Sequence, residues 1–199
     1  MTVTQTGTDA VTGTTTGTTT GTTTGTTTGT TGTTGTTGTT TRAAGRQAPV
    51  PSSLTHDQVR AVLPHRWPML LLDRVVKVVP GVKGTATKNV AGTELWFQGH
   101  FPGQAVLPGV VVVEAMAQLA GVVFALAGAS EIGYLAGVRS MRFRRPVVPG
   151  DQLVLTAEQT GGGAGFAEYR VSARVDGQIA AEGNLTIADP ANQRPARKV

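Results

Sequence analysis

Two side chains that could transfer protons, His100 and Glu114, stand fourteen residues apart in an otherwise apolar part of the sequence. An imidazole titrates near neutral pH, and a carboxyl group in apolar surroundings has a shifted pKa, so either can act as acid or base. The stretch between them contains no serine, and the whole chain has no cysteine. The pair therefore favours removal of a proton next to a carbonyl over covalent acyl transfer.

An oxyanion site is predicted between these two residues, at the start of a long helix. His100 lies in a loop rich in proline and glycine, 99–103, that leads directly to this helix. The free amides of Gly109 and Val110 could hold a developing oxyanion, and the glycine lets a carbonyl approach closely. Glu114 stands about 7.5 Å further along the helix axis, at 1.5 Å per residue. One small substrate could reach all of these groups.

The remaining histidines do not extend the pair into a metal site. Separations of nine and thirty-five residues between His56, His65 and His100 do not match metal-ligand spacing. We expect His56 to be solvated and His65 to be structural. A structural alternative for Glu114 is a core carboxylate bonded to Gln118 or to an arginine, but acid–base chemistry favours the functional interpretation.

The segment 108–127 is the one long helix that the sequence predicts, with proline at its first position and Gly128 just past its end. Within 110–127 only Glu114 and Gln118 are polar, and a spacing of four places them on one face. A membrane span is the alternative, but a carboxylate near the middle and strand patterns on both sides argue against it. A helix that is apolar all round must be buried on every side, so the sheet must wrap around it.

Alternating and valine-rich segments supply that sheet. Strict alternation over 167–175 and again over 179–187, with Asp176-Gly177 between them, predicts a hairpin. Further strands are predicted over 69–79, 82–90, 134–147 and 152–159. A capping box of Thr55 and Gln58 begins a short helix that ends at Val62. The predicted fold class is α+β, with one buried helix in a curved, mainly antiparallel sheet.

The composition divides the 199 residues into one domain and two tails. Thr12 to Thr41 contains only threonine and glycine, so residues 1–53 are predicted to be a disordered low-complexity tail. Residues 54–188 are long enough to bury a core, and 189–199 form a basic tail. The absence of cysteine excludes disulfides and zinc–thiolate sites.

The net charge of +5 does not indicate a nucleic-acid-binding domain. Most of it lies in the tails, because residues 54–188 hold twelve basic and ten acidic side chains. The N-terminus has no basic region followed by an apolar run, so it does not resemble a secretory signal. A cytoplasmic protein is expected.

Several ordered motifs point to a known family. They are Leu63-Pro64-His65-Arg66-Trp67-Pro68, Phe97-Gln98-Gly99-His100-Phe101-Pro102-Gly103, Leu107-Pro108-Gly109-Val110, Glu114-Ala115-Met116-Ala117-Gln118 and Arg142-Phe143-Arg144-Arg145-Pro146-Val147-Val148-Pro149-Gly150-Asp151. In this order they resemble 3-hydroxyacyl-(acyl-carrier-protein) dehydratases of the FabZ type, and the likeness covers Leu54 to Ile187.

The resemblance implies a hot-dog fold and homodimers in which the histidine of one subunit faces the glutamate of the other, with trimers of dimers common among relatives. It implies a lyase of lipid metabolism that dehydrates a (3R)-3-hydroxyacyl thioester to the trans-2-enoyl thioester in fatty acid or related polyketide biosynthesis. The partner is the acyl carrier protein, whose phosphopantetheine arm carries the substrate. No metal or redox cofactor is implied.

By position, the resemblance assigns His100 to abstraction of the C2 proton and Glu114 to protonation of the leaving C3 hydroxyl. The Gly109 N–H would polarise the thioester carbonyl, and Gln118 would orient Glu114. A sister family that also isomerises its product carries aspartate where Glu114 stands, so plain dehydration is favoured.

Departures from the family pattern concern Trp67, Ala105 and Leu107, where tyrosine, proline and methionine are usual, and they affect the expected substrate size. Two other functions share the fold: an acyl thioesterase, and a non-catalytic subunit that binds acyl chains. A membrane-anchored structural protein is a further alternative.

A run of four arginines has two interpretations. It is either a solvated strand edge or a docking surface that steers the acidic carrier protein. These residues are Arg139, Arg142, Arg144 and Arg145.

Overall fold

The computed structural model describes residues 51–128 and 133–190 of the chain. The threonine and glycine tract and almost all of the basic tail lie outside these residues. The predicted disorder of residues 1–53 therefore concerns a segment that lies almost entirely outside the described residues. The elements, in chain order, are α1 (His56–Val62), β1 (Arg74–Val79), β2 (Lys83–Asn89), the 3-10 helix η1 (Leu95–Gln98), α2 (Gly109–Ala125), β3 (Tyr134–Phe143), β4 (Gln152–Gly163), β5 (Phe166–Val175) and β6 (Gln178–Ala188).

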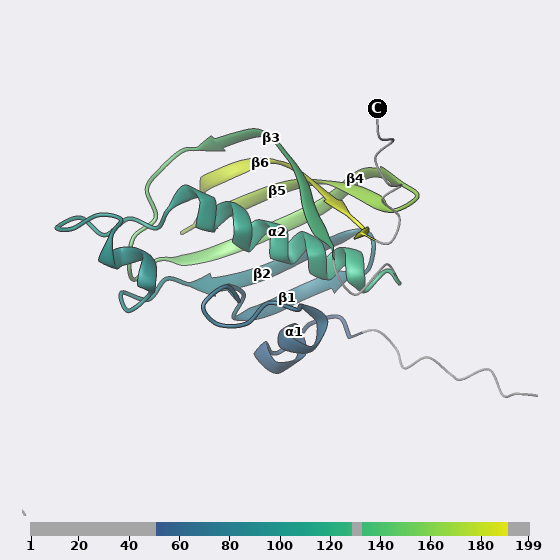
Figure 1. Cartoon of the computed structure of the whole chain (residues 1–199), viewed down its shortest axis with the longest axis horizontal. Helices are drawn as coiled ribbons and strands as arrows, with labels where there is room; N and C mark the ends of the chain where they lie inside the picture. The colour runs from purple at the N-terminus through teal and green to yellow at the C-terminus, as the bar shows by residue number, and fades with distance from the viewer. Residues whose placement is uncertain (1–50, 129–132, 191–199) are drawn as a thin grey trace, which may run out of the picture. The chain divides into compact units, whose positions relative to one another are not determined.

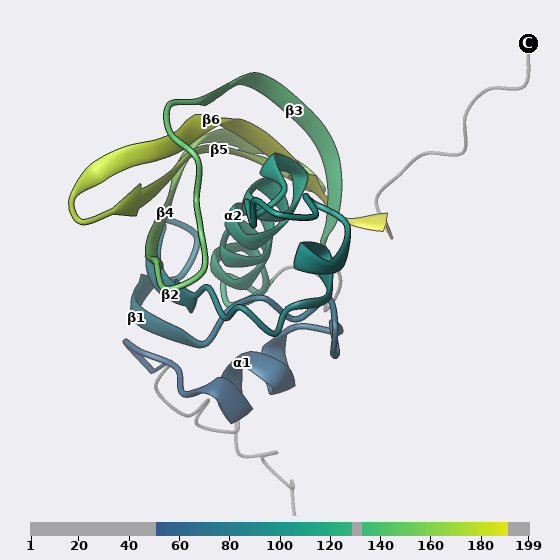
Figure 2. The same ribbon diagram turned by 90° about the vertical axis from the view of Figure 1, so that its left-hand side faces the viewer.

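The six strands form one antiparallel sheet in the order β1-β2-β4-β5-β6-β3. The sheet curves around α2, which lies along its concave face (Figures 1 and 2). Burial alternates along β5, as expected for a strand with one face on the core and one toward solvent. The predicted α+β hot-dog arrangement, a helix enclosed by a curved antiparallel sheet, is confirmed.

The helix α2 is buried along most of its length, including Gln118 among the apolar residues that fill the core. It begins at Gly109, and Pro108 is its N-cap with a ψ of 134°, so the proline stands one position before the place predicted for it. Gly128, at a φ of +83°, follows the helix end as predicted. Close packing against the sheet needs Gly84 of β2, where an added Cβ would lie 2.8 Å from a Val123 methyl.

The predicted strand over 69–79 is wrong for its first part, because only Arg74–Val79 pairs with β2. In the preceding segment the Asp73 amide still donates to the Thr87 carbonyl of β2 at 3.0 Å, but the residues before it bond to a helix side chain. Gln118 Nε2 donates to the Met69 carbonyl at 2.6 Å, and the Leu71 amide donates to Gln118 Oε1 at 2.9 Å. The apolar run is therefore held to α2 by Gln118, with Leu71 and Leu72 buried and Met69 exposed, and it is not a strand of the sheet.

The ends of two other strands differ from the predicted ones by four residues. The third strand ends at Phe143 rather than at Val147, whose carbonyl accepts from the Leu107 amide. The β4 strand continues to Gly163. The hairpin of β5 and β6 and the capping box of α1 are as predicted. No helix within 51–128 and 133–190 is long and apolar enough to cross a membrane.

Candidate active site

His100 lies in the loop between η1 and α2, and its ring and backbone are both held. Its amide donates to the Trp96 carbonyl at 2.9 Å, and its Nδ1 lies 2.8 Å from the Val106 carbonyl. A carbonyl can only accept, so Nδ1 carries the hydrogen, and in the neutral ring Nε2 keeps its lone pair. The Phe101 ring stacks on the imidazole at 3.9 Å between centroids. The geometry presents Nε2 as a proton acceptor.

The segment before this loop is held by an acidic residue that sequence reasoning missed. Glu94 accepts from Lys88 Nζ, from the Ala91 amide and from Trp96 Nε1, each at 2.9 to 3.0 Å. The Trp96 carbonyl in turn accepts a hydrogen bond from the His100 amide, so Trp96 connects Glu94 with the His100 loop. No signal in the sequence connects Lys88 with this loop, because the contact depends on tertiary folding.

A hollow of about 570 Å³ adjoins His100 at the start of α2. Gly109 lines it, and an added Cβ there would lie 2.9 Å from the Phe143 ring, which would have to shift to make room. The first amides of a helix have no acceptor within it, so they are available to a ligand carbonyl. Apolar side chains make up most of the remaining wall: Val106, Leu107, Val110, Val112, Pro146, Val147, Ala180 and Ala181.

Glu114 lies on α2 with two donors on the same carboxylate oxygen. Its Oε1 accepts from Gln118 Nε2 at 2.9 Å and lies 3.3 Å from His65 Nε2. The hydrogen bond from His65 holds the pKa of the Glu114 carboxyl below its ordinary value of 4.5, against burial, which raises it; the Gln118 bond also lowers it. The predicted contact between Gln118 and Glu114 is thus present.

His65, which the sequence predicts to be structural, lies beside Glu114. Its loop is fixed by Arg66, whose guanidinium donates to the carbonyls of Leu63 and His65 at 2.8 and 2.7 Å. This fixed backbone turns the ring toward α2. A histidine beside a proline and an arginine was the available signal, but nothing in the sequence pairs it with a carboxylate in the helix.

Glu114 and His100 do not line the same hollow within one chain. A smaller hollow of about 40 Å³ contains Glu114, His65 and Gln118, and none of its residues also lines the hollow beside His100. A site that uses both groups must therefore draw on two hollows, and the convergence of the pair across two subunits stays a prediction.

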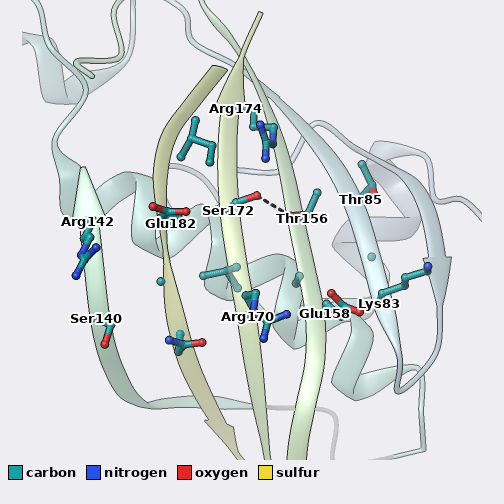
Figure 3. A pocket seen from close by; sticks show the side chains of 16 residues that line it. Lys83, Thr85, Ser140, Arg142, Thr156, Glu158, Arg170, Ser172, Arg174 and Glu182 are labelled. Atoms are coloured by element: carbon teal, nitrogen blue, oxygen red, sulfur yellow. Dashed lines mark hydrogen bonds between the residues drawn. The ribbon is translucent and has the colours of Figure 1, made fainter. Parts of the chain in front are cut away.

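Another hollow, of about 580 Å³, lies on the outer face of the sheet (Figure 3) and contains neither proton-transfer residue. Arg142 lines it and makes no ion pair within the described chain. The other three predicted docking arginines are paired. The pairs are Arg139 with Glu168 at 2.9 Å, Arg144 with Glu182 at 2.7 Å and Arg145 with Asp151 at 3.4 Å.

Comparisons with known proteins agree with this architecture. A model of the FabA-like domain family matches residues 63–184. The 3-hydroxyacyl-(acyl-carrier-protein) dehydratase FabZ of Ruminiclostridium cellulolyticum is 44% identical over 137 residues, which covers 68% of this chain and 96% of that protein. The FabZ of Polynucleobacter asymbioticus is 46% identical over 140 residues, which covers 69% and 94%.

Among solved structures, the dehydratase heterocomplex ApeI:P of Xenorhabdus doucetiae gives a TM-score of 0.57 at 24% identity and covers 66% of this chain and 90% of that one. This likeness concerns the fold alone. The fold and the residues along α2 define a hot-dog protein that carries titratable side chains beside its central helix. The chain belongs to the FabA-like family and, within it, to the FabZ-type dehydratases.

Proposed function

We propose that this chain is a hydro-lyase that removes water from 3-hydroxyacyl-(acyl-carrier-protein) to give the trans-2-enoyl thioester in fatty acid biosynthesis. The family membership supports the reaction, and one observation carries the mechanism. The ring of His100 presents a free Nε2 beside the apolar hollow at the start of α2. That position suits a base acting on the carbon next to a thioester carbonyl.

In the proposed reaction His100 Nε2 takes the C2 proton while the Gly109 amide donates to the thioester oxygen, where negative charge develops. Glu114 protonates the C3 hydroxyl, which leaves as water. Without substrate, the Glu114 carboxyl is held largely ionised by its hydrogen-bond partners, because they lower its pKa. An acyl chain that displaces water from the site raises the pKa of a carboxyl, so the proton is taken up with the substrate.

The proposal includes a homodimer, alone or as a trimer of such dimers, in which each site takes His100 from one copy and Glu114 from the other. The support is that these two residues line separate hollows in one chain. It also includes a cytoplasmic location. Two side chains and an amide suffice for this elimination, so the proposal needs no cofactor besides the carrier's phosphopantetheine.

Mixing two inactive variants tests the reaction and the shared site together. His100→Ala should abolish enoyl formation, and Glu114→Gln should lower turnover by about 10² to 10⁴-fold. When the two are refolded together, we expect about one quarter of the wild-type activity, because half of the dimers are mixed and each mixed dimer has one intact site. No recovery would mean that both groups act within one chain.

The assay follows conjugated enoyl absorbance with 3-hydroxyacyl thioesters of several chain lengths on the carrier protein and on coenzyme A. Free thiol release is measured in parallel, because a thioesterase would give thiol without the enoyl product. His56→Ala is the control variant. Thiol release alone, or activity retained in His100→Ala, would overturn the proposed function.

Carrier docking at the four arginines is a separate part of the proposal. Arg142 is the member of this group with no ion pair in the described chain, so its charge is available to an acidic partner. Arg142→Glu should raise KM for the carrier-bound substrate, increasingly so at low salt. It should leave KM for the coenzyme A thioester unchanged, and an equal rise for both carriers would contradict docking there.

A further inference from the structure

The two oxygens of the Glu114 carboxylate have different surroundings. Oε1 receives both available donors, Gln118 Nε2 and His65 Nε2. Oε2 has no hydrogen-bond partner anywhere in the described part of the chain. A carboxylic acid whose Oε1 accepts two hydrogen bonds carries its proton on Oε2, because the occupied lone pairs of Oε1 are not free to bind one.

The ring of His65 is suited to act as a donor. Its Nε2 faces Glu114, while its Nδ1 is buried with no partner in the described chain. A doubly protonated ring would leave a buried N–H unsatisfied at Nδ1, which costs free energy. The neutral ring with its hydrogen on Nε2 leaves an unpaired acceptor at Nδ1 instead of an unpaired N–H, and it donates to Oε1.

Nothing else in the small hollow competes for this role. The loop before β1 contributes Leu63 and His65, and α2 contributes Gln118. The strands β3 and β6 contribute only apolar side chains, Leu135 and Ile187. His65 is therefore the titratable group that faces Glu114 in the described chain, and the partner copy's histidine would be added in the proposed dimer.

We propose that His65 is a positioning residue for the proposed dehydration. Together with Gln118 it holds Oε1 of Glu114, so that Oε2 carries and transfers the proton. This inference rests on the proposed function and names a residue that the family motifs do not assign to the reaction. His65 is then no longer only a structural residue of the loop, because it positions the general acid Glu114.

The proton balance is complete with these groups. The C2 proton goes to the free Nε2 of His100, and the electron pair of the broken C2–H bond forms the C2–C3 double bond. The C3–O bond breaks, and the oxygen takes the Oε2 proton of Glu114 and leaves as water. The carboxylate that remains is stabilised by the two hydrogen bonds to Oε1. His65 thus acts on the charge that appears as the hydroxyl leaves, and it does not bind the acyl chain.

The test compares two substitutions at His65 in the full-length chain. His65→Phe keeps a planar ring without a donor, whereas His65→Gln keeps an amide N–H near the position of Nε2. We expect His65→Phe to lower kcat about ten- to a hundredfold, the effect of losing a hydrogen bond to a charged acceptor. KM should stay within about twofold, and His65→Gln should retain most of the wild-type kcat.

A pH profile separates positioning from a merely structural role. In His65→Phe the limb of the kcat/KM profile that reports the carboxyl should move to higher pH, because the lost hydrogen bond no longer favours the charged form. Circular dichroism checks that the variant is folded. Wild-type kcat together with an unmoved limb would overturn the inference, as would equal losses in both folded variants.

A measurement that does not depend on turnover distinguishes failure of the inference from failure of the proposed function. The titration of the Glu114 carboxyl carbon by NMR should show a higher pKa in His65→Phe than in the wild type. An unchanged titration refutes the role of His65 even if the enzyme is a dehydratase. A shifted titration in a protein that forms no enoyl product refutes the proposed function instead.

Discussion

Lys88 and Glu94 form an ion pair that is almost removed from solvent, with Nζ 3.0 and 2.9 Å from the two carboxylate oxygens. The side chain of Lys88 is 5% exposed and that of Glu94 is 17% exposed. The pair joins the end of β2 to the segment that leads to His100. Such a pair adds little net stability over apolar residues, but breaking one half leaves a buried charge uncompensated.

We therefore predict that Lys88→Met lowers the free energy of unfolding by about 3 to 5 kcal/mol. Urea denaturation gives this value, and kcat should fall further than the unfolded fraction explains, because the His100 loop loses its support. Lys83→Met is the matched control, since Lys83 is exposed on the same strand and has no ion pair in the described chain. Equal stability of the two variants would contradict the prediction.

Gly84 should not tolerate even a methyl group. An added Cβ would lie 2.8 Å from Val123 Cγ2 and 2.9 Å from Leu119 Cδ1, both in the core. We predict that Gly84→Ala lowers stability by about 1 to 3 kcal/mol through overpacking. Gly92→Ala, where the nearest atom is 3.7 Å away, should change it by less than about 0.5 kcal/mol. Thermal melting of the two variants makes the comparison.

Tyr169 offers a stabilising substitution. Its hydroxyl is buried without a partner in the described chain, and burial raises the pKa of this phenol above its ordinary value of 10.0. Removing the hydroxyl removes its desolvation cost, so Tyr169→Phe should raise stability by about 1 kcal/mol at neutral pH. Tyr134→Phe, at an exposed position, is the control.

The advantage of Tyr169→Phe should grow at alkaline pH. A phenol with a raised pKa in the folded state contributes stability that is lost as the pH rises above the unfolded value near 10. Denaturation measured at pH 8 and pH 11 checks the sign. If the stability of the wild type rose relative to that of the variant between pH 8 and pH 11, the hydroxyl would not be buried as described.

Glu114 should give the opposite dependence. Its pKa is lowered in the folded protein, so its ionised form contributes stability that is present above the unfolded value near 4.5 and lost as the pH falls through the folded value. We predict that the wild type loses more stability than Glu114→Gln when the pH falls below about 4.5. Parallel denaturation curves for the two proteins in this range would contradict the lowered pKa.

Local patterns in the sequence predict the elements well and their long-range contacts poorly. The buried helix, the hairpin around Asp176 and the capping box at Thr55 depend on neighbouring residues, so spacing and turn chemistry are sufficient to place them. His65 and Lys88 could not be recognised in this way. Their partners are chosen by how the loops fold over α2 and β2, which hydrophobic periodicity does not encode.

The error over 69–73 has the same origin. An apolar run predicts a strand, because strands and buried extended segments share one composition. Here the side-chain amide of Gln118 is the hydrogen-bond partner of Met69 and Leu71, in the place that a neighbouring strand would take. The same side chain donates to Glu114, so one residue bonds both to this segment and to the carboxylate that the resemblance expects it to orient.

The hydrogen bond from the Leu71 amide to Gln118 makes that amide a reporter for the interior of the protein. Its deuterium exchange is governed by a side chain that also touches Glu114, and not by a neighbouring strand. A ligand that binds to the Glu114 carboxylate should therefore change the exchange rate of the Leu71 amide. The exchange rates of amides within the β5–β6 ladder should stay unchanged.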